Sequence, residues 1–230
     1  MKKIGIVGGL SPESTILYYK TIVDEYKRIK GDEKYPDIII YSVNFGLFTE
    51  YVEKGMDREA ADIIVEAIKA LHRAGADFVV ISANTPHMFY DYIASKSPIP
   101  LINIIDALAE QAIKDGVKVI GLLGTKYTLT KGFYVDRLAE HGIKAVVPEP
   151  PDIETVNNII YNELVKGIIR DESRRTLIGI IKRLKEKGVE AVALACTELP
   201  LLLTGSVDNV KLYDTARIHA LKALYEALKD

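Results

Sequence analysis

Cysteine is almost absent from this chain, since Cys196 is the only one in 230 residues. A lone thiol excludes an internal disulfide and a metal site built from several cysteines. Long hydrophobic runs are missing as well: none reaches ten residues, which is too short to cross a bilayer, and no signal-peptide core with a cleavage site follows the amino terminus. We therefore expect a cytoplasmic protein with no membrane partner.

An excess of charge of either sign is also missing. The formal net charge is −2 and the basic residues are spread along the chain, so nothing predicts a nucleic-acid partner. Tryptophan is absent and Gln111 is the only glutamine, whereas lysine, glutamate and isoleucine are abundant. This composition is typical of a thermophile's protein. The hydrophobic content of 48% indicates a globular chain with a sizeable core.

An internal repeat divides the chain into two halves of similar pattern. Residues 3–8 resemble residues 119–124, and a later segment of the first half recurs 113 residues on, with Ala83 matched by Cys196 (83 + 113 = 196). The other matched positions of that segment are Ile64, Ile68, Leu71 and Gly75 against Leu177, Ile181, Leu184 and Gly188. The repeat predicts two copies of one α/β unit, with a methyl group in one copy where the other has a thiol.

Apolar runs alternate with amphipathic stretches along the whole chain, which predicts parallel sheets with right-handed crossovers and helices on both faces. The expected strands are 3–8, 37–43, 77–82, 119–123, 144–147 and 191–195, and the expected helices are 11–30, 58–74, 131–140, 174–187 and 215–228. The expected fold class is therefore α/β, with two similar parallel-sheet domains; if these are related by pseudo-twofold symmetry, an active site would lie in the cleft between them.

Two features of the sequence indicate where the domain boundaries lie. Pro98 and Pro100 mark a crossing between the halves. Residues 211–230 have no evident counterpart at the end of the first half, so we expect them to return to the first domain. The predicted first domain comprises residues 1–98 and 209–230, and the second comprises residues 99–208.

Polar residues follow four of the predicted strands, at the strand ends where ligands bind in parallel α/β sheets. These loops begin at Gly8, Ala83, Gly124 and Cys196, and they offer hydroxyls, an amide and backbone N–H groups suited to a small carboxylate or phosphate. The Gly8-Gly9 loop lacks both the dinucleotide and the Walker spacing, so it equally fits a simple strand-to-helix turn.

Cys196 is the strongest chemical candidate of these loops. A cysteine at a strand end is more often a small buried hydrophobe than a nucleophile. Here a strand gives way to an expected helix start, which would lower the thiol pKa, and the polar Thr197 and Glu198 follow. The four histidines have no metal-ligand spacing, and only His87 follows a candidate loop. No metal site is expected.

Together these segments resemble the aspartate/glutamate racemase superfamily, the pyridoxal-independent amino-acid racemases. The opening Ile-Gly-Ile-Val-Gly-Gly and residues 196–198, Cys-Thr-Glu, are similar to family motifs, and residues 83–87, Ala-Asn-Thr-Pro-His, stand where the family has Cys-Asn-Thr-x-His. Further similar segments are 121–125 with Thr128 and Tyr134, and 214–215 with His219. The resemblance spans nearly the whole chain.

This resemblance implies a cofactor-independent homodimer that acts on an amino acid or a related small carboxylate, with one cysteine removing the α-proton and another returning it. Cys196 would be the remaining catalytic thiol and Ala83 a degenerate catalytic position. The implied substrate-binding residues are Ser11, Asn84, Thr85, Thr125, Thr128, Lys166 and Thr197.

Two departures from the family pattern bear on function. Ala83 can neither give nor take a proton, so two-way racemisation is expected to be one-sided or weak unless Thr85, another side chain or a water substitutes. Leu47 and Phe48 stand where aspartate-selective members carry an arginine, which favours a less acidic substrate side chain.

Three functions are therefore compared. The first is a racemase-type isomerase with Cys196 as acid and base. The second is a single-cysteine decarboxylase of the arylmalonate type, in which Cys196 reprotonates an enolate and Ala83 lines an apolar pocket with Phe48 nearby. The third is an amino-acid-binding protein that has lost the chemistry.

Overall fold

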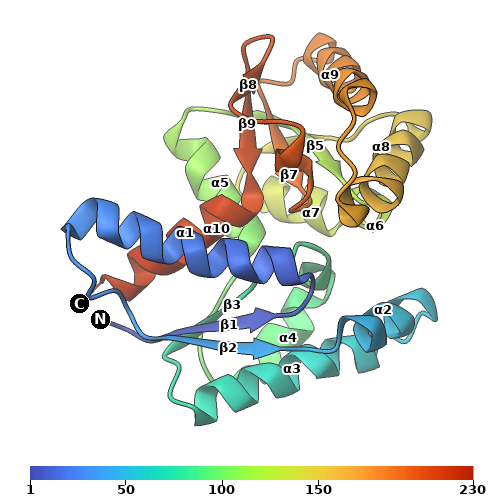
Figure 1. Cartoon of the computed structure of the whole chain (residues 1–230). Helices are drawn as coiled ribbons and strands as arrows, with labels where there is room; N and C mark the ends of the chain where they lie inside the picture. Colours follow the sequence, from blue (N-terminus) through green and yellow to red (C-terminus); the bar gives the residue numbers. More distant parts are fainter. Residues whose placement is uncertain (230) are drawn as a thin grey trace. The chain divides into compact units, whose positions relative to one another are not determined.

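The chain forms two α/β domains in a computed structural model, in which residues 1–229 are described (Figure 1). One domain comprises Met1–Ile104 and the segment that begins at Ala216, and the other comprises Ile105–Thr215. The boundaries lie a few residues beyond the predicted ones. The shift has a physical reason, because residues 101–102 pair with the first sheet and residues 210–214 pair with the second.

The first domain is built on a parallel sheet. Within residues 1–229 its strand order is β2-β1-β3-β4, with β1 (Ile4–Gly8) between β2 (Ile38–Ser42) and β3 (Phe78–Ile81), and β4 (Leu101–Ile102) at the edge. The helices are α1 (Pro12–Lys30), α2 (Phe45–Glu53), α3 (Asp57–Arg73), α4 (Tyr90–Lys96) and α10 (Thr215–Ala227), and a 3₁₀ helix, η1 (Thr85–Phe89), precedes α4.

Helices cover both faces of this sheet, as the apolar strands predicted. On one face, Ile4 and Ile6 of β1 pack with α1 and α10, and α3 lies on the opposite face (Figure 1). The start of α1 follows the expected local chemistry: Ser11 accepts a hydrogen bond from the Ser14 amide at 3.3 Å, and Pro12 occupies the first helical position. These contacts fix the loop between β1 and α1.

The second domain repeats this topology. Its sheet, within the same described residues, has the order β6-β5-β7-β9-β8, with β5 (Val119–Gly124), β6 (Lys144–Val146), β7 (Ala191–Ala195) and β9 (Val210–Asp214) parallel. The edge strand β8 (Ser206–Val207) is antiparallel to β9. The helices are α5 (Ile104–Lys114), α6 (Lys126–Thr130), α7 (Phe133–Glu140), α8 (Pro150–Asn162) and α9 (Asp171–Glu186), with two 3₁₀ helices, η2 (Leu164–Lys166) and η3 (Leu199–Leu201).

The closing segment does have a counterpart, contrary to the prediction. Each half ends in a strand followed by a helix, β4–α5 in the first and β9–α10 in the second, and each strand joins the sheet of its own half. The two helices are exchanged: α5 belongs to the second domain and α10 to the first. The sequence pattern hid this match because β4 has only two residues.

Other differences are local. The helix expected over 131–140 is α7, which begins at Phe133 because Gly132 before it adopts a left-handed conformation with φ of 81°. The sequence pattern does not predict the helices α2, α4, α5, α6 and α8. No helix among the described residues combines the length and hydropathy that a membrane span requires.

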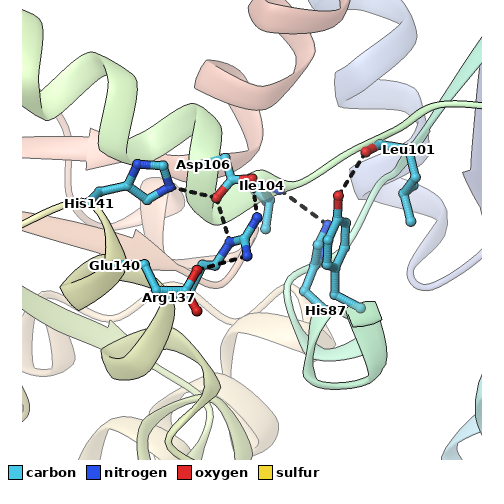
Figure 2. A network of polar contacts seen from close by, with 8 residues as sticks. His87, Leu101, Ile104, Asp106, Arg137, Glu140 and His141 are labelled. Carbon is cyan, nitrogen blue, oxygen red and sulfur yellow. Dashed lines mark hydrogen bonds and ion pairs between the residues drawn. The ribbon is translucent and has the colours of Figure 1, made fainter. Parts of the chain in front are cut away.

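A polar cluster joins two helices of the second domain (Figure 2). The Asp106 carboxylate of α5 accepts two hydrogen bonds from the Arg137 guanidinium of α7, both at 2.7 Å, and lies 2.8 Å from His141 Nε2. Burial raises the pKa of Asp106, but the hydrogen bonds from Arg137 and His141 outweigh it and hold that pKa below its usual value. The ionised carboxylate is therefore the form that links the helices.

Gly9 is expected to be intolerant of substitution. Its φ is +81°, and an added Cβ would lie 2.5 Å from the Val43 carbonyl oxygen and 2.6 Å from Ser42 Oγ. Gly9→Ala should lower the free energy of unfolding by about 2–5 kcal/mol, the sum of left-handed strain and overpacking. Gly31→Ala is the matched control, since it has φ of +72° but open space around the new Cβ, and it should cost only about 1–2 kcal/mol. Equal losses in urea unfolding would contradict the close approach at Gly9.

The Asp106 cluster predicts a pH-dependent stability difference. A carboxyl with a lowered folded-state pKa stabilises the protein above its unfolded pKa, and this stabilisation is lost as pH falls through the folded value. Asp106→Asn should therefore lower the free energy of unfolding at neutral pH, and the difference should shrink in acid, as pH falls below the ordinary aspartate pKa of about 3.9. Glu140→Gln, which removes an exposed partner of Arg137, should have little effect at either pH. A pH-independent Asp106→Asn difference would be inconsistent with this ionisation.

Candidate functional site

In the first domain, parallel register brings three loops to one edge of the sheet. Gly8 pairs with Ser42, and Val7 pairs with Ile81. The loops that begin at Gly9, Val43 and Ser82 therefore leave the sheet side by side. This edge carries the predicted residues Ser11, Ala83, Asn84 and Thr85.

The loop after β1 is a tight turn whose polar groups are used within the loop. The Gly9 amide donates to Thr15 Oγ1 at 2.9 Å, and the Thr15 hydroxyl donates to the Ser11 carbonyl at 3.0 Å. Ser11 caps α1, as predicted from its position before Pro12. The glycines serve close backbone packing, which is the simpler of the two interpretations of Gly8-Gly9.

The loop after β3 presents Ala83, Asn84 and Thr85. Ala83 and Asn84 are buried, with 9% and 5% of their surfaces exposed, and Thr85 is half-buried. Thr85 begins the 3₁₀ helix η1. The Ala83 carbonyl accepts a hydrogen bond from His87 Nδ1 at 2.9 Å. The amide of Asn84 and the hydroxyl of Thr85 therefore follow directly after a methyl group whose carbonyl is held by His87.

In the second domain the equivalent edge carries the thiol. Gly124 pairs with Ala195, and Leu194 pairs with Asp214. Thr125, Cys196 and Thr215 are therefore the first residues after β5, β7 and β9, and they leave the sheet at the same edge. The Thr215 hydroxyl donates to the Leu194 carbonyl at 2.9 Å, which ties the end of β9 to the end of β7.

Two threonines of this edge are held in fixed positions. Thr125 caps α6 by accepting from the Thr128 amide at 3.3 Å, and the two hydroxyl oxygens lie 3.1 Å apart. Both residues are buried. Lys166 lies elsewhere in the domain, exposed on η2 after α8 rather than at a strand end. The structure thus groups Thr125, Thr128, Cys196 and Thr197 at strand ends and leaves Lys166 outside that group.

Cys196 is more deeply buried than the sequence indicated. Only 8% of its surface is exposed, and it packs in the hydrophobic cluster that α8 and α9 share with β7. Its thiol donates to Glu198 Oε2 at 2.9 Å, and the Thr197 hydroxyl donates to the same oxygen at 2.8 Å. The thiol, a hydroxyl and a carboxylate form one local hydrogen-bonded group.

The predicted lowering of the Cys196 pKa is wrong. The segment directly after Cys196 leads into η3, a 3₁₀ helix of three residues, rather than into an α-helix. So short a helix supplies little helix dipole to lower the thiol pKa. Burial, followed by the negative charge of Glu198, raises the pKa of the thiol well above its usual value. The resting form of Cys196 is therefore the protonated thiol.

Glu198 is a candidate site residue whose contact with the thiol the sequence does not predict. Its place two residues after the cysteine was visible, but nothing in the sequence specified that its carboxylate turns back to the thiol. Among residues 1–229, no group of three or more histidine, cysteine or acidic side chains is arranged to hold a metal ion. The strand ends of the second domain nevertheless carry ionisable groups, among them Cys196 with its partner Glu198, and Asp214 at the end of β9.

The region of Leu47 forms a groove in the first domain. Leu47 is 38% exposed, whereas Phe48 is only 4% exposed and belongs to the core. The groove has a volume of about 650 Å³ and includes Asn44, Leu47 and Tyr51, together with the acidic side chains of Glu59, Asp62 and Glu66. Carboxylates in this lining disfavour an acidic group.

Comparisons with known proteins agree with this architecture. Residues 7–223 match the family model for the Asp/Glu/hydantoin racemases. RacX of Bacillus subtilis (strain 168), a broad specificity amino-acid racemase, is 23% identical over 217 residues, which cover 93% of this chain and 92% of RacX.

Two solved structures align over the full length of this chain and of their own. A candidate Asp/Glu racemase from Yersinia pestis is 41% identical with a TM-score of 0.95. An aspartate racemase homologue from Pyrococcus horikoshii OT3 is also 41% identical, with a TM-score of 0.87.

The single thiol permits a direct test of its electrostatics. Because Glu198 raises the pKa of Cys196, Glu198→Gln should lower that pKa and increase the rate of alkylation by iodoacetamide at about pH 8, on the order of tenfold for each pKa unit. Glu154→Gln, which changes an exposed carboxylate of the same domain, should leave the rate unchanged. An unchanged or slower rate in Glu198→Gln would show that Glu198 does not control the thiol.

Proposed function

Because the chain belongs to the Asp/Glu/hydantoin racemase family, we propose that it is an amino-acid racemase-type isomerase that works without a cofactor and uses Cys196 as its one catalytic thiol. The observation that carries this proposal is the hydrogen-bonded pair of Cys196 and Glu198 after β7. Thr125, which follows the neighbouring strand β5 and caps α6, lies at the same edge of the sheet. The family match over residues 7–223 supports it. We further expect a cytoplasmic homodimer, as the family resemblance implies.

The proposed proton path begins with the protonated thiol. The Cys196 S–H bond breaks and its proton passes to Glu198 Oε2, which already accepts it in a hydrogen bond. The thiolate then takes the α-proton of the amino acid, and the Cα–H electrons remain on the substrate as a carbanion. When the thiol returns this proton, or one exchanged with water through Glu198, the α-carbon regains a hydrogen.

The buried threonines provide oriented donors for the substrate. Thr125 and Thr128 hold two hydroxyls at fixed positions beside the thiol's strand, and Asn84 and Thr85 supply an amide and a hydroxyl in the first domain. Such preorganised donors favour the charge that develops on the substrate carboxylate. Lys166, which is exposed in this structure, is proposed as a substrate contact only from the family resemblance.

The first-domain loop limits the reaction. The Ala83 side chain has no acid or base, so the substrate would lose and regain its proton mainly through Cys196. Exchange of the substrate α-proton with solvent should therefore be faster than inversion of the configuration at the α-carbon. The acidic groove beside Leu47 further supports an amino acid with a neutral or basic side chain over aspartate.

A protonated, buried thiol also fits a second function. A decarboxylase of the arylmalonate type needs only a proton donor to an enolate, and the raised pKa of Cys196 keeps that donor loaded. Phe48 is buried in the core, so its ring is not available to contact a substrate in such a pocket. Carbon dioxide release from a disubstituted malonate would favour this second function over the first.

The decisive experiment is α-proton exchange in D₂O, followed by ¹H NMR over a panel of L- and D-amino acids. The wild type should exchange at least one enantiomer, and Cys196→Ser should lower the rate by about 10²–10⁴-fold, since it removes the acid–base group. Thermal unfolding of Cys196→Ser is the control, and a change below about 1.5 kcal/mol is expected for this nearly isosteric substitution.

Ala83→Cys tests the degenerate position. A second thiol should raise inversion relative to exchange, measured as the ratio of the enantiomer formed to the deuterium incorporated. Ala83→Ser has a similar size but a far weaker acid–base group, and serves as the matched control. A well-folded wild type that exchanges the α-proton of no amino acid would contradict the racemase proposal. Thermal stabilisation by an amino acid without any turnover would then identify a binding protein.

A further inference from the structure

A buried histidine of the first domain is hydrogen-bonded to backbone groups at both of its ring nitrogens. His87 is 2% exposed. Its Nδ1 lies 2.9 Å from the Ala83 carbonyl oxygen. Its Nε2 lies 3.2 Å from the Ile104 amide nitrogen, a contact drawn in Figure 2. One end of the ring therefore holds the loop after β3, and the other end holds the first residue of α5.

These partners specify the tautomer of His87. A carbonyl oxygen can only accept, so Nδ1 carries the hydrogen, and an amide N–H can only donate, so Nε2 carries the lone pair. The neighbouring His219 has the opposite assignment, because its Nε2 lies 3.0 Å from the Ile102 carbonyl and its Nδ1 accepts from the Tyr18 hydroxyl at 2.8 Å. The two buried rings meet edge to face at 5.8 Å.

Side chains from three elements hold the segment by which the chain leaves the first domain. The Tyr90 hydroxyl donates to the Leu101 carbonyl at 3.0 Å, His219 donates to the Ile102 carbonyl, and His87 accepts from the Ile104 amide. The amide at the start of a helix has no partner within the helix, so His87 acts as a distant cap of α5. The His87 ring also stacks on Tyr90, with an interplanar angle of 10°.

We propose that His87 is a positioning residue, which fixes the Ala83–Thr85 loop through Ala83 and couples that loop to residues 101–104 through Ile104. The inference rests on the proposed function for the role of the Ala83–Thr85 loop, but the coupling itself is a property of the first domain. Since Asn84 and Thr85 follow the clamped carbonyl directly, the ring sets the orientation of the loop's amide and hydroxyl. The same ring connects substrate contact at this loop to the start of α5.

Two variants that each mimic one ring nitrogen of His87 separate the two hydrogen bonds. In His87→Asn the side-chain amide can replace Nδ1 as donor to Ala83 but is too short to reach Ile104. In His87→Gln the side-chain carbonyl can replace Nε2 as acceptor from Ile104, and the bond to Ala83 is lost. His72→Asn, a change at an exposed histidine of α3, is the control.

Protein amide exchange in H₂O/D₂O, read by NMR without substrate, measures each bond separately. His87→Gln should accelerate exchange of the residue 87 amide, which donates to Asn84, by about fivefold or more, and leave the Ile104 amide as in the wild type. His87→Asn should give the reverse. Equal acceleration of both amides in both variants, or in neither, would overturn the proposal and leave His87 as a packing residue.

Substrate exchange then tests the consequence for function. His87→Gln should lower the turnover number for α-proton exchange about tenfold more than His87→Asn does, because only the former releases the loop that contacts the substrate. Equal losses in the two variants would contradict the role of the Ala83 bond. An inactive wild type would defeat the racemase proposal, whereas the amide exchange pattern would still report on His87.

A wild-type measurement covers the case in which the variants do not fold. The chain has four histidines, so long-range ¹⁵N–¹H correlations can assign each ring. His87 should show hydrogen on Nδ1 and His219 hydrogen on Nε2. The same tautomer in both rings, or rapid averaging of the His87 tautomers, would overturn the proposal.

Discussion

Parallel pairing in a fixed register is the constraint on which the candidate site depends. In each domain the central strand is flanked by neighbours that end at the same level, because Gly8 pairs with Ser42 and Gly124 pairs with Ala195. A shift of one residue would turn every side chain of a strand to the other face of the sheet. The register therefore decides that Thr125 and Cys196 emerge together, although they lie far apart in the sequence.

Glycine makes that register possible in both halves. Gly5 and Gly121 are matched positions of the repeat, and an added Cβ would lie 2.7 Å from Val79 Cγ1 in the first domain and 3.1 Å from Leu184 Cδ1 in the second. The strand orders β2-β1-β3-β4 and β6-β5-β7-β9 then correspond element by element. One packing solution has thus been used twice, with different chemistry at the strand ends.

The chemistry of the thiol comes from its surroundings rather than from its place after a strand. An apolar cluster removes water from Cys196, and Glu198 adds a negative charge. Both effects disfavour the thiolate, so the thiol can donate a proton as it stands but must be deprotonated before it can remove one. The proposed racemase reaction therefore needs a base for the thiol proton, and Glu198, which already accepts the hydrogen bond of the thiol, is the proposed base.

The sequence by itself determined the α/β class, the two-domain repeat, the strands near 3–8 and 191–195, and the loops that carry Ala83 and Cys196. Strong apolar periodicity, glycine and the Ser11–Pro12 cap act over a few residues, so they can be recognised without the fold. Only the tertiary structure decided the exchange of α5 and α10, the burial and protonation of Cys196, and the two-sided contact of His87. These features depend on contacts between distant segments, such as His87 with Ile104 and Ile102 with His219, and no local pattern encodes which residues such segments will meet.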